Sequence, residues 1–569
     1  MINFKQELAN LLLKENLALE EDFILSSLET PPDKKMGDYA FPCFVLAKQL
    51  RKSPKLIAEE LKDKISADFL EKIENVGGYL NFFIKAEYLA KTTIESVLEK
   101  KEKYGSTNQG EGKTICVEYS STNIAKPFHI GHLRSTVQGD VIASIFEFLG
   151  YKTIRINYLG DYGTQFGMLI NAYELWGNKE ALDQDPIKEM LRLYVKYNEE
   201  AEKDEKLLDE ARRRFYLLEQ KSEREMEIWE KFKELSLREF KRVYDLLDIS
   251  FDSWDGEAYH SQFMPAIIEE LKEKNMLIED EGAWIIPLDD EDMPPAIVIK
   301  SNGSSTYIAR DIATANYRKK TYDFTESIYV VATEQNLHFR QLKEILSRMG
   351  RDWWDQVTHV SFGMVSLKDG AMGTRKGKVL FLEDVINQAI DKTMKIMEER
   401  NPLLENKKEV AKAVGIGAIK FQELYNNRIK DYVFSWDEIL NFEGETGPYV
   451  QYTTARCGRV LEKAGEEGID YSNNINFALI SDESEKNLVR SIYDFPETIQ
   501  DACRKKEPSL ITRHIANLAK EYNKFYNSCP ILNAPNEEVR KLRLAISFAA
   551  FTGLKIGLTL LGIQAPKEM

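Results

Sequence analysis

The stretch TICVEYSSTNIAKPFHIGHLRSTVQGDVIASIFEFLGYKTIRINY, residues 114–158, decides the fold of this chain. Residues 114–119 have the β-branched and aromatic side chains of a buried strand, and residues 153–158 predict a second strand. Between them, residues 132–149 predict a helix that ends at Gly150 as its C-cap. A strand, a helix and a strand at this spacing form a βαβ unit, whose parallel strands bind ligands at their carboxyl ends.

The βαβ unit belongs to a predicted parallel-sheet domain over residues 112–400. Charged segments at 188–247 have apolar residues at spacings of three and four, which predicts long helices inside an insertion at about residues 170–290. We expect the parallel sheet to resume with strands at residues 296–300, 304–309 and 328–332.

Two further domains are predicted on either side. Residues 1–105 read as an α+β domain that ends in the polar linker 99–113, with helices at 4–13 and 55–65 and a strand at 79–84. Residues 401–569 read as all-α. The expected fold class is therefore multidomain α/β, and 569 residues suit three to five domains at about 150 residues each.

The composition excludes several classes of protein. The 93 acidic and 77 basic residues give a net charge of −16, which argues against binding nucleic acid through bulk charge. The most apolar stretch, residues 545–554, is stopped by Lys555, so we expect no membrane span and a cytoplasmic protein. Five widely spaced cysteines without a CxxC pair indicate neither disulfides nor a zinc site.

His129 and His132 lie where the first predicted strand passes into the helix. A metal site is a poor explanation for them, because the spacing is not helical and no third ligand of suitable type is near. A phosphate site explains them better. A helix starting at His132 would offer free N–H groups to an anion, Gly131 would let a nucleotide approach the backbone, and the imidazoles would donate hydrogen bonds to phosphate oxygens.

These residues do not stand alone. Glu118, Asn123, Lys126, His129 and His132 together resemble the signature of class I aminoacyl-tRNA synthetases, and STNIAKPFHIGHLRSTVQGD resembles the arginyl-tRNA synthetases in particular. Segments similar to that family recur in order: GDYAFPCFVLAKQL from residue 37, GGYLNFFI from 77, NYLGDYGTQFGML from 157, YIARD from 307, YVVATEQNLHF from 329, FEGETGPYVQYTTAR from 442 and GLTLLGIQAPKEM from 557.

The resemblance implies a Rossmann-like catalytic domain, an N-terminal domain that binds the tRNA elbow and a C-terminal domain that binds the anticodon. It implies an arginine–tRNA ligase, which activates L-arginine with ATP and transfers the arginyl group to the 2′-OH of the terminal adenosine of tRNA(Arg). Such catalysis rests on positioning and charge neutralisation. Mg²⁺ would be held by phosphates and water, with no dedicated protein site, and the protein would be a monomer.

A second phosphate element is expected at residues 371–378, the counterpart of the family's KMSKS loop. It departs from that pattern, with Ala371 and Gly373 at the usual first Lys and Ser. The resemblance implies that Lys126 supplies the missing cation. The expected catalytic residues are Lys126, His129, His132, Arg375 and Lys376, and the same resemblance places His129, Gly131, His132, Lys376 and the backbones of Met364 and Val365 against ATP.

Arginine recognition requires planar acceptors, because a guanidinium carries fixed N–H donors and stays charged. By resemblance, Glu118 and Asp311, brought from different strand ends, are expected to form this carboxylate pair, and Tyr307 is expected either to pack on the guanidinium plane or to close the pocket. By similarity, the residues near the α-amino and carboxyl groups are Ser120, Asn123, His129 and Gln335.

Aromatic and basic residues are the expected tRNA contacts. Tyr449, Tyr452 and Arg456 match the family's anticodon-binding segment, while Tyr39, Phe41 and Phe82 are expected as exposed aromatics facing the tRNA elbow. Residues 501–569 contain 11 Lys and Arg against 6 Asp and Glu, which favours a polyanion-facing surface as much as ordinary solvated helices.

Two alternatives stay open on the sequence. One is a class I synthetase for another amino acid such as lysine or glutamate, although glutamate would require cations where Glu118 and Asp311 stand. The other is a catalytically silent synthetase-like protein that binds RNA, which the departures at Ala371 and Gly373 favour and the retained His129, His132, Lys126 and Lys376 oppose.

Overall fold

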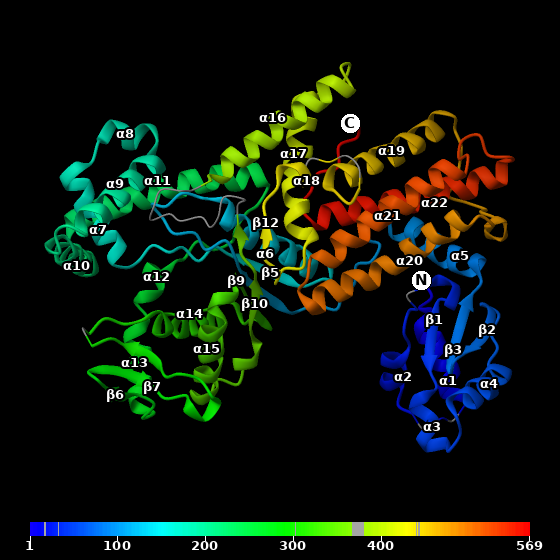
Figure 1. The fold of residues 1–569 in the computed structure, drawn as a ribbon, viewed down its shortest axis with the longest axis horizontal. Helices are drawn as coiled ribbons and strands as arrows, with labels where there is room; N and C mark the ends of the chain where they lie inside the picture. Colours follow the sequence, from blue (N-terminus) through cyan, green and yellow to red (C-terminus); the bar gives the residue numbers. More distant parts are fainter. Residues whose placement is uncertain are drawn as a thin grey trace. The chain divides into compact units, whose positions relative to one another are not determined.

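The computed structural model describes residues 1–569 except 16, 18, 32, 302, 367–379, 440, 442 and 443. The chain forms two compact units (Figure 1). Unit 1 consists of residues 1–104, 453–496 and 517–556, and unit 2 of residues 105–452, 497–516 and 557–569. Each unit thus combines segments from distant parts of the sequence. The three domain boundaries given above stay a prediction.

Unit 1 contains an antiparallel sheet in the order β1-β3-β2. Its N-terminal elements, which include the predicted helices and strand, are α1 (Phe4–Lys14), α2 (Glu21–Ser27), β1 (Tyr39–Pro42), α3 (Phe44–Leu50), α4 (Pro54–Lys64), β2 (Leu70–Val76), β3 (Tyr79–Ile84) and α5 (Ala86–Lys100). The start of α1 contacts α20 (Glu483–Lys505), where the Tyr493 hydroxyl accepts the Phe4 N–H at 3.0 Å. The Tyr104 hydroxyl donates to the Ile492 carbonyl at 2.9 Å, so the polar linker region is anchored to the same helix.

Unit 2 is built on a parallel sheet in the order β10-β9-β4-β5. Its strands are β4 (Thr114–Glu118), β5 (Lys152–Ile156), β9 (Glu326–Ala332) and β10 (Val357–Phe362). The crossover between β4 and β5 is the almost wholly buried helix α6 (Ile130–Phe148). The predicted βαβ unit is therefore confirmed.

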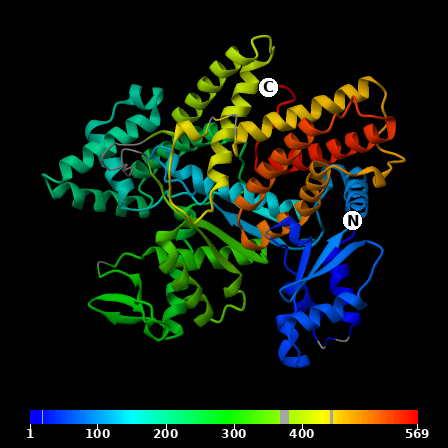
Figure 2. The same cartoon turned by 45° about the vertical axis from the view of Figure 1, so that its right-hand side comes forward.

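A helical insertion follows β5, as the spacing of apolar residues predicted. Its helices are α7 (Thr164–Trp176), α8 (Lys179–Gln184), α9 (Pro186–Ala201), α10 (Lys206–Glu219) and α11 (Glu223–Leu247). In both ribbon views these helices form a bundle apart from the small sheet β6–β8 (Figures 1 and 2). That sheet consists of β6 (Ile278–Asp280), β7 (Ala283–Ile286) and β8 (Ala296–Ile299).

The predicted strand at 296–300 is confirmed as β8, but its place in the parallel sheet was wrong, and the predicted strand at 304–309 was wrong altogether. Residues 296–300 do not rejoin the parallel sheet, because β8 pairs with β7 in antiparallel fashion after a connection too short for a crossover. Residues 304–309 are not a strand, since Ser305 makes only an isolated bridge to Ile299 and Tyr307 opens helix α14 (Tyr307–Tyr322). Ile308, Ile312 and Ala315 lie buried on one face of α14, a helical spacing that overrides the local strand propensity.

Among its described residues, the predicted all-α region 401–569 contains one strand. The short strand β12 (Tyr432–Val433) pairs in parallel with β11 (Val365–Ser366). The helices are α16 (Leu382–Arg400), which begins before this region, and α17 (Lys407–Tyr425), α18 (Trp436–Ile439), α19 (Gly447–Glu466), α20, α21 (Ser509–Ser528) and α22 (Glu537–Leu560). In the described chain only α22 is long and apolar enough to cross a membrane, and 72% of its apolar window is buried within the fold, as in a core helix.

Candidate active site

The first turn of α6 is capped by two imidazoles. The helix begins at Ile130 rather than at His132, and His129 is its N-cap. His129 Nδ1 accepts the Gly131 N–H at 3.1 Å, while His132 Nδ1 accepts the His129 N–H at 3.2 Å. The ring centroids lie 3.9 Å apart. Free N–H groups were expected at this helix start. That expectation needs correction, because the N–H groups of His129 and Gly131 are already bonded to the imidazoles.

This capping sets the protonation of both rings. Each Nδ1 accepts a hydrogen bond, so the ring proton of each neutral imidazole is on Nε2. Burial, helped by the nearby Lys126 charge, lowers the pKa of His129 to about 4. Burial and the charges of His129 and Lys126 hold the pKa of His132 well below 6.5. At neutral pH the pair therefore offers two uncharged Nε2–H donors.

Histidine NMR can test this protonation state. With imidazole carbons labelled, we expect the His129 and His132 signals to stay in the neutral form from pH 8 to about 5, because depressed pKa values postpone protonation to lower pH. The signal that disappears in His129→Gln is assigned to His129, and the signal that disappears in His132→Gln is assigned to His132. The His338 signal, whose pKa is raised, should titrate above 6.5 and serves as the internal comparison. An inflection near pH 6.5 for His129 would contradict the capping arrangement.

The loop between β4 and α6 holds the other expected residues of the signature. Ser120 is buried, and its backbone has φ +68°. Asn123 is half-buried and forms a backbone bridge to Gly160, where an added Cβ would lie 2.1 Å from Asn123 Oδ1. Lys126 Nζ lies 5.4 Å from the ring centroid of Tyr194 on α9. The loop therefore packs closely on the segment after β5 and on the helical insertion.

A second cluster gathers charged groups beside β4. Glu118 Oε2 at the end of β4 lies 2.6 Å from Arg318 Nη2 on α14, and both side chains are buried. Asp311 Oδ2 lies 2.6 Å from His338 Nε2 on α15 (Asn336–Arg348), and Arg310 pairs with Glu257 at 3.2 Å. Asp311 therefore comes from a helix and not from a strand end, which corrects the expected geometry of the carboxylate pair.

The charges of this cluster act on one another. Burial raises the pKa of Glu118. The charge of Arg318 opposes this rise, and the charge of Asp311 adds to it. Burial raises the pKa of Glu257 to about 7 against the opposing effect of Arg310. Burial alone would lower the pKa of His338, but the hydrogen bond to Asp311 raises it. The cluster thus holds three carboxylates beside two guanidinium groups and the His338 imidazole, and each of the three carboxylates already has a basic partner.

The other residues expected to contact substrates are Tyr307, Gln335 and Met364. Tyr307 is 66% exposed at the start of α14, with Arg310 Cζ 5.5 Å from its ring centroid, and Gln335 is exposed just after β9. Both backbone groups of Met364 are engaged: its N–H donates to Asp431 Oδ1 at 2.6 Å and its carbonyl accepts from Tyr432 N–H at 3.1 Å. Adenine could accept from the Met364 N–H only by displacing Asp431, whereas the Met364 carbonyl keeps a second lone pair that could accept another donor.

The basic loop 371–378, with Arg375 and Lys376, lies outside the described residues. Its flanks are described. Strand β11 precedes it, and on the other side the Leu380 carbonyl accepts the Ile130 N–H at 3.2 Å while the Leu382 N–H donates to the Phe128 carbonyl at 2.9 Å. The segment that follows the loop is therefore bonded directly to the histidine motif.

The expected tRNA-elbow residues are buried. Tyr39 is 6% exposed, and Phe41 and Phe82 are fully buried, so all three belong to the core and these assignments were wrong. They alternate inward on β1 and β3, with Tyr39 opposite Phe82. The exposed aromatic residues of this region are Phe23, Phe44 and Tyr79.

The expected anticodon contacts lie on α19. Tyr452 is exposed, and Tyr449 and Arg456 are half-buried. Arg456 donates to Asn523 Oδ1 at 2.5 Å, and its guanidinium lies 5.1 Å from the ring centroid of the exposed Tyr526. Stacking of unpaired bases needs accessible aromatic faces of this kind.

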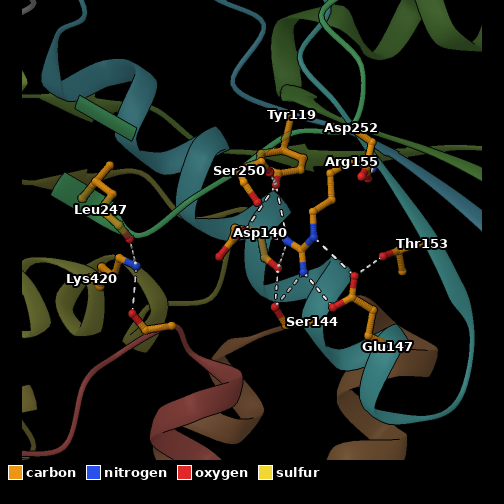
Figure 3. A network of polar contacts seen from close by, with 11 residues as sticks. Tyr119, Asp140, Ser144, Glu147, Thr153, Arg155, Leu247, Ser250, Asp252 and Lys420 are labelled. Atoms are coloured by element: carbon orange, nitrogen blue, oxygen red, sulfur yellow. Dashed lines mark hydrogen bonds and ion pairs between the residues drawn. The ribbon is translucent and has the colours of Figure 1, made fainter. Parts of the chain in front are cut away.

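Several residues of the site were missed from the sequence. Arg318 follows Asp311 by seven residues, which is two helical turns, but the helix itself was not predicted there. His338 lies within the family-like segment that starts at residue 329. Arg155 on β5 was also missed; it pairs with Asp140 at 2.6 Å and with Glu147 at 3.0 Å, and it lies beside Tyr119 (Figure 3).

In the described part of the chain, no three His, Cys, Asp or Glu residues are grouped so as to hold a metal ion. A resident metal therefore does not fit the described residues.

Comparisons with known proteins agree along the whole chain. The family model for the class I (R) tRNA synthetase catalytic domain matches residues 93–436, that for the DALR anticodon binding domain residues 450–569, and that for the arginyl tRNA synthetase N terminal domain residues 3–84.

Individual relatives match over their full lengths. The arginine–tRNA ligase of Halothermothrix orenii is 52% identical and that of Clostridioides difficile 50% identical, each over 570 residues and 100% of both chains. The solved structure of Thermus thermophilus arginyl-tRNA synthetase is 26% identical and matches with a TM-score of 0.83 over 100% of both chains. The chain therefore belongs to the arginyl-tRNA synthetase family of class I aminoacyl-tRNA synthetases.

Proposed function

We propose that this chain is an arginine–tRNA ligase that converts L-arginine and ATP to arginyl-adenylate and transfers the arginyl group to the 2′-OH of the terminal adenosine of tRNA(Arg). The observation that carries the proposal is that unit 2 contains both two neutral imidazole donors at the start of α6 and the carboxylates Glu118 and Asp311 beside β4.

In the proposed reaction, the arginine carboxylate attacks the α-phosphate of ATP and pyrophosphate leaves. His129 and His132 donate from Nε2 to phosphate oxygens whose negative charge grows in the transition state. Lys126 supplies a cation beside them, since its charge already acts on both imidazoles. Because no protein nucleophile is required, the residues contribute positioning and charge.

Arginine is held through its guanidinium. We propose Asp311 as the main acceptor, because its partner is a histidine, whereas Glu118 is already paired with Arg318. A carboxylate has about four lone-pair sites, so Glu118 can accept a second guanidinium beside Arg318. A carboxylate pair separates arginine from lysine by geometry and from citrulline by charge.

The finer parts of the proposal follow from this reaction. ATP would enter as its magnesium complex, with the ion held by phosphates and water. Arg375 and Lys376 would reach the outer phosphates from the loop that adjoins residues 380–382. The enzyme would act as a cytoplasmic monomer, and arginine activation would require bound tRNA, as the family resemblance implies.

Charging assays decide among the candidate functions. Purified protein is incubated with total tRNA and ATP, one labelled amino acid at a time, and ATP–pyrophosphate exchange is measured with and without tRNA. We expect charging with arginine alone, and exchange only when tRNA is present. Charging with another amino acid, or with none, would overturn the proposed function; full exchange without tRNA would overturn only the tRNA requirement.

An exposed aromatic patch on unit 1 is the revised candidate for tRNA binding. The Phe44 and Tyr79 rings are exposed and pack edge to face at 5.4 Å, beside the exposed Lys48 and Arg51. Because a stacked base contributes about 1–3 kcal/mol, we expect the double variant Phe44→Ala, Tyr79→Ala to raise the KM for tRNA roughly tenfold or more. Arginine and ATP KM values should not change.

The control for this patch is Phe23→Ala, which removes an exposed phenylalanine from α2 of the same unit. It should leave the KM for tRNA at the wild-type value. Equal KM values for the double variant and this control would remove the patch from the tRNA-binding surface.

A further inference from the structure

We infer that helix α11 of the insertion is the element that sets the shape of the catalytic loop, with Ser236 and Tyr244 as positioning residues for the activation reaction. The inference rests on the proposed function for its kinetic effects. The loop, residues 119–129, joins β4 to α6 and contains three non-glycine residues with positive φ: Ser120 at +68°, Ser121 at +46° and Ala125 at +61°.

Such backbone angles are costly for residues with a Cβ and persist only where the surroundings enforce them. Positions 120 and 125 are each held by a side chain of α11. Ser236 Oγ accepts the Ala125 N–H at 2.9 Å, and the Tyr244 hydroxyl lies 2.6 Å from Ser120 Oγ. All four residues are buried, so no water competes for these bonds.

The contacts follow one stripe of the helix. Ser236, Phe240 and Tyr244 are spaced by four residues and therefore lie one above another on α11. Phe128, the residue before His129, packs on this stripe, with ring centroids 6.1 Å from Phe240 and 5.2 Å from Tyr244. The stripe thus touches the immediate neighbours of Lys126 and His129 as well as Ser120 itself.

The hydroxyl of Tyr244 also connects the loop to the rest of the site. It accepts from Asn157 Nδ2 at 2.9 Å, after the end of β5. On its other side, Ser120 Oγ lies 2.8 Å from Thr136 Oγ1, which lies 2.7 Å from the His132 carbonyl oxygen. Loss of the Tyr244 hydroxyl therefore disturbs Ser120 directly and His132 only through Thr136.

The far end of the stripe is anchored independently. The buried Lys420 ammonium on α17 donates to the Leu247 carbonyl, the last residue of α11, at 2.5 Å and to the Gly562 carbonyl at 2.8 Å (Figure 3). Because α11 is held beyond Tyr244, its stripe presents a rigid template to the loop, as pre-organised catalysis requires.

We expect substitutions of Tyr244 and Ser236 to have different kinetic effects. Ser120 is expected beside the α-amino and carboxyl groups of arginine, so Tyr244→Phe, which removes the hydroxyl and keeps the ring packing, should raise the KM for arginine and lower kcat. Ala125 precedes Lys126, so Ser236→Ala should raise the KM for ATP and lower kcat. Since small misplacements can cost up to about 100-fold, we expect kcat/KM losses of roughly 10- to 100-fold.

The test compares full-length Tyr244→Phe and Ser236→Ala with a matched control, Tyr197→Phe. Tyr197 is a buried tyrosine of α9 whose hydroxyl bonds the Leu207 carbonyl at 2.5 Å and Asn171 at 3.1 Å, away from the loop. The control should keep wild-type KM and kcat values in the tRNA-supplemented exchange assay. If all three variants behave alike, or if Tyr244→Phe and Ser236→Ala raise both KM values equally, α11 has only a structural role.

Amide hydrogen exchange gives a readout that does not depend on the reaction. We expect exchange in the peptide covering residues 119–129 to become faster in Tyr244→Phe and Ser236→Ala, and to stay unchanged in Tyr197→Phe. If amide hydrogen exchange of this peptide is unchanged in Tyr244→Phe and Ser236→Ala, the inference is wrong, even when the wild-type enzyme activates arginine normally. A wild-type protein that activates no arginine would instead overturn the proposed function, while the exchange result would still decide whether α11 shapes the loop.

Discussion

Replacing Glu118 by Gln should abolish arginine activation and lower the free energy of unfolding by about 3–5 kcal/mol. The stability loss arises because Arg318, whose Nη2 lies 2.6 Å from Glu118 Oε2, would stay buried with an uncompensated charge. The activity loss arises because one of the two proposed acceptors for the substrate guanidinium disappears. Urea unfolding and tRNA-supplemented ATP–pyrophosphate exchange with arginine measure the two effects separately.

The double variant Glu118→Gln, Arg318→Met separates stability from recognition. Replacing both partners of a buried ion pair removes the uncompensated charge, so the unfolding free energy should return close to that of the wild type. Arginine activation should stay abolished. If the double variant regains both stability and arginine activation, Glu118 serves only as the partner of Arg318 and Asp311 alone binds the guanidinium.

Replacing His132 by Ala should lower kcat of arginine activation by about 100- to 1000-fold, the loss typical of removing one preorganised donor to a developing negative charge. The same change leaves the His129 N–H without the Nδ1 acceptor at 3.2 Å, so His129 also loses its orientation. Rapid quench of adenylate formation reports the chemical step itself.

A matched control is His514→Ala on α21, where the imidazole Nδ1 lies 3.1 Å from Thr498 Oγ1. It should keep the wild-type rate of adenylate formation. A rate for His132→Ala within threefold of this control would show that the imidazole pair caps α6 without taking part in the reaction.

The positions of Glu118 and Asp311 could be predicted from the sequence only in part. Glu118 could be placed at the end of β4 because the four residues before it, 114–117, have strand propensity. Asp311 could be recognised as a candidate from its motif, but its helix could not, because residues 304–309 have local strand propensity. The pairing of Glu118 with Arg318 depends on how α14 packs beside β4, and no local pattern contains that information.

The exposure of aromatic side chains on β1 and β3 also depends on tertiary packing. Tyr39, Phe82 and Tyr79 all belong to one small antiparallel sheet, and aromatic residues on strands suit either face. Packing of that sheet buries Tyr39 and Phe82 and leaves Tyr79 exposed. A one-residue shift in register would reverse the pattern, so exposure cannot be read from composition alone.

The sequence by itself determined the βαβ unit, the helical insertion and the family, because alternating and helical periodicities are local and the motif residues lie close together in the chain. Only the tertiary structure decided which charges meet, which ring nitrogens carry protons and which helix holds the strained loop. Those properties depend on burial from solvent and on contacts between residues far apart in the chain, such as Glu118 with Arg318, and both exist only once the chain has packed.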